Sequence, residues 1–333
     1  MRKLIFILLL FVVLATAAAG MLLQDWKSFR RQPLNPDGPV QLWLAEGSSF
    51  RSMVRQLETL GLTRLDWRWR LLGRLEAPAL KAGEYRIRQG ASVDELIALL
   101  ESGRVHRHQF TIVEGWGVAE LRAALAADFR LQQQTRALDE EQLMTKLGCA
   151  ECPAEGWFLP ESYHFTRPAS DFSLLQRAHR AMKGLLEQTW AERASGLPLD
   201  EAYQLLVLAS LIERETGLDS ERKLVAGVFV RRLAQGMRLQ TDPTVIYGLG
   251  DDFSGRLTRK NLRTDHAWNT YTRNGLPPTP IALPGKSSLQ AAAHPADGAY
   301  LYFVSRGDGS HHFSATLEEH NAAVDRYIRR KSQ

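Results

Sequence analysis

The chain has 333 residues, enough for about two domains, and its composition is that of a folded globular protein. No internal repeat or long low-complexity tract is present, which excludes repeat and low-complexity architectures. The 42 Lys and Arg exceed the 37 Asp and Glu by five and are scattered along the chain, so the charge does not require nucleic acid, and we predict no nucleic-acid partner.

The N-terminus predicts a membrane anchor. Behind the basic residues Arg2 and Lys3, an uncharged apolar run extends over residues 4–23, long enough to cross a bilayer as one helix. The basic residues predict a cytoplasmic N-terminus, with the chain after Gln24 in the periplasm. The alternative is a signal peptide cleaved near residues 17–19, but the apolar run exceeds the usual length of a signal sequence. We therefore predict a single-pass protein of the inner membrane.

A polar linker and a small domain are expected next. Residues 24–38 are rich in Arg and end in PLNPDGP, which is typical of a linker. Residues 39–108 predict a strand–helix–helix–strand–helix unit. Ser92 and Glu95 predict a capping box on its last helix, and Gly103 predicts the end of that helix. This unit offers no paired acid, base or nucleophile, so we expect it to bind or to act as a spacer.

Cys149 and Cys152 form a C-x-x-C pair. A second such pair is missing, and no His follows at the spacing of a zinc ligand, so we do not predict a zinc site. The pair is interpreted as a short structural disulfide or as two idle thiols. Four further histidines also lack metal-site spacing, and we predict neither a metal nor a cofactor; they are His294, His311, His312 and His320.

Residues 109–333 predict a larger domain of mixed helices and strands, and the fold class is α+β. Its most apolar helix is expected from Asp200 to Thr216, followed by another helix and by long loops rich in Pro and Gly. Loops of that length are uncommon unless they build a site. A hairpin is expected over residues 299–314, and a capping box of Thr316 and Glu319 should begin the last helix.

Glu215 is the candidate catalytic acid. At about 100° per residue it falls on the apolar face of its helix, whereas Glu213 points more than about 100° away. We expect Gly217 to cap the helix in the left-handed conformation, with Glu215 in the negative last turn. Apolar neighbours and this helix end both raise the pKa of Glu215, as a general acid at neutral pH requires. The alternative is a solvated residue, or one neutralised by an arginine; the candidates are Arg231, Arg232 and Arg238.

The loops after this helix carry groups suited to a sugar chain. Amides, hydroxyls and tyrosine faces match the hydroxyl and acetamido edges of a polysaccharide better than they match a phosphate. Asp242 precedes Pro243, so its alternative role is to organise its own turn. The candidate substrate-binding residues are Gln240, Thr241, Asp242, Asn269 and Tyr271.

Several segments resemble one known family. LASLIERETG, GVFVRRLAQGMRLQTDPTVIYG, NTYTRNGLPPTPIALPG and HHFSATLEEHN are similar to the endolytic murein transglycosylases of the MltG (YceG-like) family, in the same order. The resemblance extends from about residue 40 to the C-terminus. It implies a LysM-like subdomain at 39–108 and a catalytic domain at 109–333. It also implies that Glu215, the acid before Thr in ERET, is the catalytic glutamate.

The resemblance implies a reaction and partners. The implied reaction is non-hydrolytic cleavage between N-acetylmuramic acid and N-acetylglucosamine in peptidoglycan strands, which leaves a 1,6-anhydro end and trims or terminates nascent strands. Peptidoglycan synthases or division proteins are implied as further partners. Two alternatives stay open: a glycan-binding scaffold without activity, and a true hydrolase that uses Asp242 or Glu161 as a second carboxylate.

Overall fold

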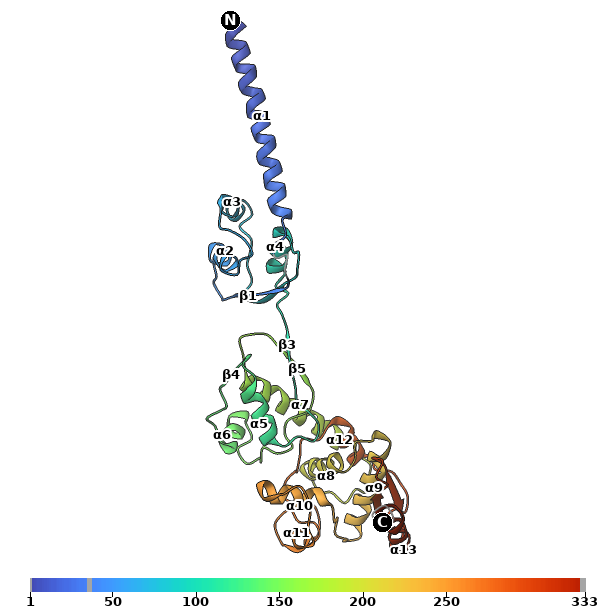
Figure 1. The fold of residues 1–333 in the computed structure, drawn as a ribbon. Helices are drawn as coiled ribbons and strands as arrows, with labels where there is room; N and C mark the ends of the chain where they lie inside the picture. Colours follow the sequence, from blue (N-terminus) through green and yellow to red (C-terminus); the bar gives the residue numbers. More distant parts are fainter. Residues whose placement is uncertain (1, 35–37, 330–333) are drawn as a thin grey trace. The chain divides into compact units, whose positions relative to one another are not determined.

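The structure is a computed structural model of the chain and describes residues 2–34 and 38–329. It divides into two compact units. Unit 1 is Met1–His108 with His164–Pro168, and unit 2 is Gln109–Tyr163 with Ala169–Gln333. Both units contain helices and strands (Figure 1), so the prediction of a mixed fold is confirmed.

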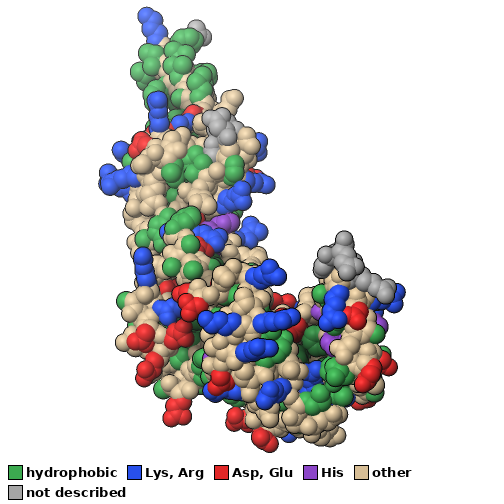
Figure 2. Space-filling view, turned by 60° about the horizontal axis from the view of Figure 1, so that its bottom comes forward, with side chains coloured by type: hydrophobic (Ala, Val, Ile, Leu, Met, Phe, Trp, Pro, Cys, Tyr) green, Lys and Arg blue, Asp and Glu red, His purple; other side chains and the backbone are tan. Residues whose placement is uncertain are grey.

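A long apolar helix begins the chain. α1 runs from Arg2 to Arg31, and the apolar side chains of residues 4–23 are exposed, as the green surface at the top of Figure 2 shows. Its length and composition make it a candidate membrane span, although a signal sequence has the same features. The predicted N-terminal apolar helix is confirmed to this extent.

The predicted linker over residues 24–38 differs from the structure. α1 continues through residues 24–31, and Phe29 and Leu34 are buried in the core of unit 1. The Phe29 ring packs edge-on against Trp69, with 5.2 Å between the ring centroids. These apolar residues, set among polar ones, attach the segment to unit 1. Residues 35–37 of the predicted linker lie outside the described residues.

Unit 1 contains a two-stranded sheet and three further helices. β1 (Val40–Leu44) pairs antiparallel with β2 (Gly83–Ile87). The helices are α2 (Phe50–Thr59), α3 (Trp67–Leu75) and α4 (Val93–Ser102). The capping box of Ser92 and Glu95 is present, and Gly103 ends α4 in the left-handed region with φ 69°, so both predictions are confirmed. The likeness of this unit to a LysM domain stays a prediction.

Unit 2 is built around an apolar helix. α8 (Ala202–Glu215) packs against α7 (Asp171–Ala191), α9 (Asp219–Ala234), α10 (Asp242–Leu249) and α12 (Lys286–Ala293). Residues 205–212 of α8 are all buried, because a helix that is apolar on every side must be enclosed. This core fixes the helix that ends at Glu215.

Smaller elements complete unit 2. Its helices include α5 (Val118–Ala127), α6 (Glu140–Leu147), α11 (Arg259–Arg263) and α13 (Leu317–Val324), with a 3-10 turn at Gly250–Asp252 and a π turn at Asp325–Arg329. β4 (Leu131–Gln132) pairs with β6 (Ala169–Ser170). β3 (His108–Thr111) pairs with β5 (Ser162–Phe165), and each of these two strands contains residues of both units. β7 (Tyr302–Ser305) and β8 (His311–Ser314) form the predicted hairpin, and the predicted capping box begins α13. Cys149 and Cys152 are joined by a disulfide, the first of the two interpretations.

Candidate active site

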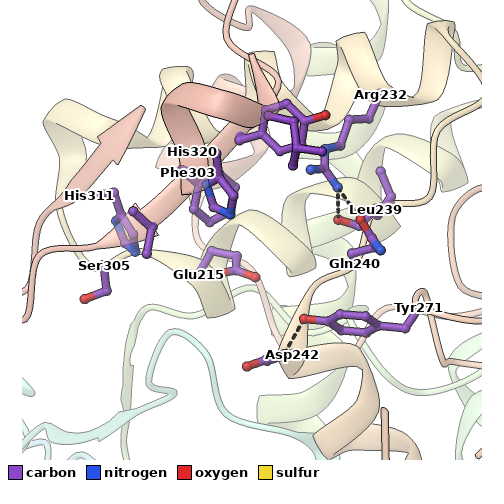
Figure 3. A pocket seen from close by; sticks show the side chains of 13 residues that line it. Glu215, Arg232, Leu239, Gln240, Asp242, Tyr271, Phe303, Ser305, His311 and His320 are labelled. Carbon is purple, nitrogen blue, oxygen red and sulfur yellow. Dashed lines mark hydrogen bonds between the residues drawn. The ribbon is translucent and has the colours of Figure 1, made fainter. Parts of the chain in front are cut away.

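Glu215 is the last residue of α8, and its side chain faces a cavity (Figure 3). The helix ends because Thr216 is extended, with φ −143° and ψ 133°. Gly217 is not in the left-handed region, so the predicted glycine cap is wrong. Thr216 is buried, and its hydroxyl accepts a hydrogen bond from the Leu218 N–H at 3.1 Å. That bond turns the chain away directly after Glu215.

A threonine hydroxyl holds the Glu215 carboxyl. Thr241 Oγ1 donates a hydrogen bond to Glu215 Oε1. Thr241 is buried, and its N–H donates to Thr270 Oγ1 at 3.1 Å. The hydroxyls of Thr270 and Thr244 lie 2.9 Å apart. This buried chain of threonines fixes the donor, and thereby the orientation of the carboxyl.

The surroundings of Glu215 raise its pKa to about 7. Desolvation is the main cause, because the charged form is disfavoured away from water. The Thr241 hydrogen bond and the charge of His311 oppose this rise, whereas the neighbouring negative charge of Asp242 adds to it. A carboxyl with a pKa near neutrality can donate a proton and later take one back.

The arginines considered as neutralising partners do not pair with Glu215 within the described residues. Arg231, Arg232 and Arg238 each donate to backbone carbonyl oxygens instead. Arg232 also donates to Gln240 Oε1 at 3.3 Å. The structure therefore favours an acid that keeps its proton over an ion-paired carboxylate.

The cavity in front of Glu215 has a volume of about 380 Å³, which is in the range of small-ligand sites. In Figure 3, Asp242 and Tyr271 lie on one side of Glu215, and the residues of the β7–β8 hairpin and α13 lie on the other. The lining residues are Glu215, Arg232, Leu239, Gln240, Asp242, Tyr271, Tyr302, Phe303, Val304, Ser305, His311, Leu317 and His320.

Three of the predicted substrate-binding residues lie in the cavity wall: Gln240, Asp242 and Tyr271. The Tyr271 hydroxyl donates to Asp242 Oδ1 at 2.6 Å. Asp242 is the first residue of α10, where the helix dipole favours a negative charge. Gln240 has φ 52°, a conformation that non-glycine residues rarely adopt and that is found at active sites among other places. These three residues thus present polar groups beside Glu215.

The other two predicted residues have different surroundings. Thr241 is buried and contacts Glu215 itself. Asn269 is fully buried, and its amide nitrogen donates to backbone carbonyls, including that of Thr264 at 2.7 Å. Its Oδ1 accepts from the Tyr271 N–H at 2.8 Å. We therefore correct the expected role of Asn269: its side chain holds the loop that carries Tyr271 and does not line the cavity.

His311 lines the cavity on the side opposite Asp242 and Tyr271, and the sequence did not predict it as a site residue. His311 begins β8, and both its N–H and its ring Nδ1 contact the Glu221 carboxylate, at 2.9 and 2.8 Å. Glu221 lies on α9, 90 positions earlier in the chain, so no local sequence pattern predicts the contact between His311 and Glu221. Arg232, in the same helix, also lines the cavity, with its guanidinium 5.0 Å from the centroid of the Tyr302 ring.

Glu213 has different surroundings from Glu215. Its carboxylate accepts from Gly285 N–H at 3.0 Å and from Ser288 Oγ at 2.7 Å, and lies 3.4 Å from Arg222. The Arg222 and Glu213 side chains are 7% and 6% exposed. Glu213 therefore joins α8 to α9 and α12 and does not line the cavity. The predicted separation of the two glutamates onto different faces is present in the structure.

The chain is similar to one family of known proteins. The model of the YceG-like family matches residues 42–326. The endolytic murein transglycosylase of Bacillus subtilis (strain 168) is 33% identical over 274 residues, which cover 77% of this chain and 76% of that protein. The enzyme of the same name from Streptococcus pneumoniae D39 is 26% identical, over 88% of this chain and 59% of its own length. A crystal structure of a YceG-like protein from Listeria monocytogenes, 27% identical, covers 85% of this chain and 98% of its own, with a TM-score of 0.57.

Proposed function

The chain belongs to the YceG-like family, and from that premise we propose that it is a lytic transglycosylase of peptidoglycan in which Glu215 is the only acid–base residue. The observation that carries this proposal is the Glu215 carboxyl, which has a pKa of about 7, faces the cavity and has no basic ion-pair partner among the described residues. The names of the relatives supply the substrate, peptidoglycan, and the endolytic mode of cleavage.

The proposed reaction needs one proton donor and no water. Glu215 donates its proton to the oxygen between N-acetylmuramic acid and N-acetylglucosamine as that C–O bond breaks. The resulting carboxylate then removes the proton of the muramic acid 6-hydroxyl, whose oxygen bonds to the positively charged anomeric carbon. The products are a free N-acetylglucosamine hydroxyl and a 1,6-anhydro end, and Glu215 has regained its proton.

Neighbouring groups support this cycle. Asp242 beside Glu215 places negative charge near the anomeric carbon, where positive charge develops. Thr241 orients the carboxyl through its hydroxyl. Gln240 and Tyr271 supply an amide and an aromatic ring for the hydroxyl and acetamido groups of the glycan. We propose Gln240, Asp242 and Tyr271 as the residues that contact the glycan, and Thr241 as the residue that positions the Glu215 carboxyl.

Asp242 supports a second candidate function, that of a glycoside hydrolase with two carboxylates. It lines the same cavity as Glu215, and an ordinary glycosidase requires two carboxylates on either side of the bond. Its hydrogen bond from Tyr271 occupies one oxygen and leaves the other able to activate a water. A hydrolase built on this pair would release products that contain one additional water.

For the rest of the chain we propose the following arrangement. α1 is a retained anchor in the inner membrane, with residues 1–3 in the cytoplasm and both units in the periplasm. Unit 1 is a LysM-like module that binds glycan strands, with its boundary near residue 108. The site then acts on strands close to the membrane, where peptidoglycan synthases or division proteins are its expected partners.

The Glu215→Gln variant tests the proposed acid. The amide keeps the shape of the side chain but cannot deliver a proton, so we expect cleavage of purified peptidoglycan to fall by at least about 10²-fold. A thermal melt of the same preparation should show an intact fold. Near-native cleavage by Glu215→Gln would refute the assignment.

A further inference from the structure

A second pocket lies in unit 1, between α2 and α3. It has a volume of about 480 Å³, and we call it the α2–α3 pocket. Its apolar part consists of Phe50, Val54, Leu65 and Trp69. Three arginines also line it: Arg51, Arg70 and Arg74. An apolar pocket bordered by three cationic side chains suits a ligand that has both an apolar part and an anionic group.

The three arginines have no carboxylate partner in the part of the chain that the structure describes. Their neighbours Arg30 and Arg68 differ, because each forms ion pairs with two acidic side chains. α2 also begins at this pocket, with no acidic residue in its first turn, so the positive end of its dipole adds to the charge. The pocket therefore holds uncompensated positive charge.

The base of α1 lies next to this pocket. Arg68 at the start of α3 pairs with Asp25 of α1 at 3.3 Å, and Trp69 of the pocket packs against Phe29. In Figure 1, α3 accordingly lies beside the last turns of α1. At about 1.5 Å per residue, Phe29 lies only about 9 Å beyond Leu23, the end of the apolar run. The headgroup layer of a bilayer is about 5–8 Å thick on each side. Phe29 therefore lies just beyond the headgroup layer, and the pocket beside it lies at the outer edge of the lipid headgroups.

The exposed side chains around α3 match this position. Trp67 is 48% exposed and Leu75 is 68% exposed, although both are large and apolar. Tryptophan is enriched at the boundary between lipid and water. Figure 2 shows Lys and Arg side chains, in blue, around the base of the apolar helix. Apolar and basic groups together are typical of a surface that rests on an anionic membrane.

We propose that the α2–α3 pocket binds the phosphate headgroup of an anionic phospholipid, with its acyl region against the partly exposed Phe50 and Leu65. This site is additional to the proposed function and rests on α1 entering the membrane. The bound lipid would hold unit 1 against the bilayer surface through Arg51, Arg70 and Arg74.

The test uses the full-length chain in neutral detergent, with native mass spectrometry to count retained lipids. Phosphatidylglycerol, phosphatidylcholine and inorganic phosphate are the probes. We expect one phosphatidylglycerol per chain, preferred at least about tenfold over phosphatidylcholine, because each arginine near an anionic headgroup favours binding about fivefold. The variant with Gln at 51, 70 and 74 should lose this preference.

A matched control changes three other exposed arginines of unit 1 to Gln: Arg86, Arg104 and Arg107. It removes the same charge and should keep the preference. The proposal would be overturned if both triple variants kept the preference for phosphatidylglycerol or if both lost it. Binding of inorganic phosphate as tight as that of the lipid would also overturn it. Thermal melts verify folding, and Arg70→Glu alone replaces the triple variant should that variant not fold. Because the assay is done in detergent, its outcome is separate from whether α1 spans a membrane and from peptidoglycan cleavage.

Discussion

Two glutamates only two positions apart in α8 have different chemical roles because their surroundings differ. Glu213 accepts hydrogen bonds from Gly285 and Ser288 and forms an ion pair with Arg222. Glu215 has one hydroxyl donor and a negative neighbour, and desolvation raises its pKa to about 7. Environment, and not residue type, therefore selects Glu215 as the proposed acid.

The Thr241 hydroxyl should set the pH dependence of cleavage. Glu215 must be protonated in the free enzyme, so kcat/KM should fall as pH rises through its pKa of about 7. The hydrogen bond from Thr241 stabilises the carboxylate and lowers this pKa. Thr241→Val removes that bond, so the pKa of Glu215 should rise. The pH range in which kcat/KM falls should then move to higher pH. A pH profile of kcat/KM measures the shift.

Thr241→Ser is the matched control, because it keeps the hydroxyl and should keep this pH range in place. A range that stays in place in Thr241→Val, or that moves to lower pH, would show that Thr241 does not act on the charge of Glu215.

Glu213→Gln should affect stability and not chemistry. The change removes the charge that faces buried Arg222, so we expect a loss of about 1–3 kcal/mol in the free energy of unfolding. Cleavage per folded molecule should stay within about tenfold of the wild type, since Glu213 does not line the cavity. Chemical denaturation and a peptidoglycan assay on the same sample measure both. An unchanged stability together with lost cleavage would reverse the roles of the two glutamates.

At the scale of elements, the sequence predicts what local pattern determines. The capping boxes of Ser92 and Thr316 depend on residues three positions apart, and both are present. The glycine cap at Gly217 fails because burial of Thr216, a tertiary effect, ends α8 earlier. The linker prediction fails over residues 24–31 because Phe29 finds its partner Trp69 forty residues later. The end of a helix, and the packing of one segment against another, depend on contacts with residues that are distant in the sequence.

The site shows the same division between local and distant information. Glu215, Gln240, Asp242 and Tyr271 line one cavity. The position of Glu215 on its helix and the family resemblance made it a candidate, and their residue types made the other three candidates. The sequence could not show that the Asn269 amide binds its own loop, because an amide serves a backbone carbonyl or a sugar equally well. The pair of His311 and Glu221 could not be foreseen either, since its members meet only in the fold.

At the level of the whole chain, α1 is a candidate membrane span. We expect the full-length protein to stay in the membrane fraction after washing with high salt, with its N-terminus intact, because the apolar residues 4–23 are exposed in the structure. A reporter fused after Gln333 should be active only in the periplasm. N-terminal sequencing of the mature protein provides the control. A soluble protein that begins near Gly20 would show that α1 is a cleaved signal sequence.

In the proposed reaction, one carboxyl, that of Glu215, catalyses cleavage of the glycan without water. The most direct measurement is the mass of the products released from purified peptidoglycan by the full-length protein. We predict fragments that end in 1,6-anhydro-N-acetylmuramic acid, one water lighter than hydrolysed fragments, and none of them with Glu215→Gln. Products that carry the additional water would contradict the claim and would make Asp242 the second carboxylate of a hydrolase.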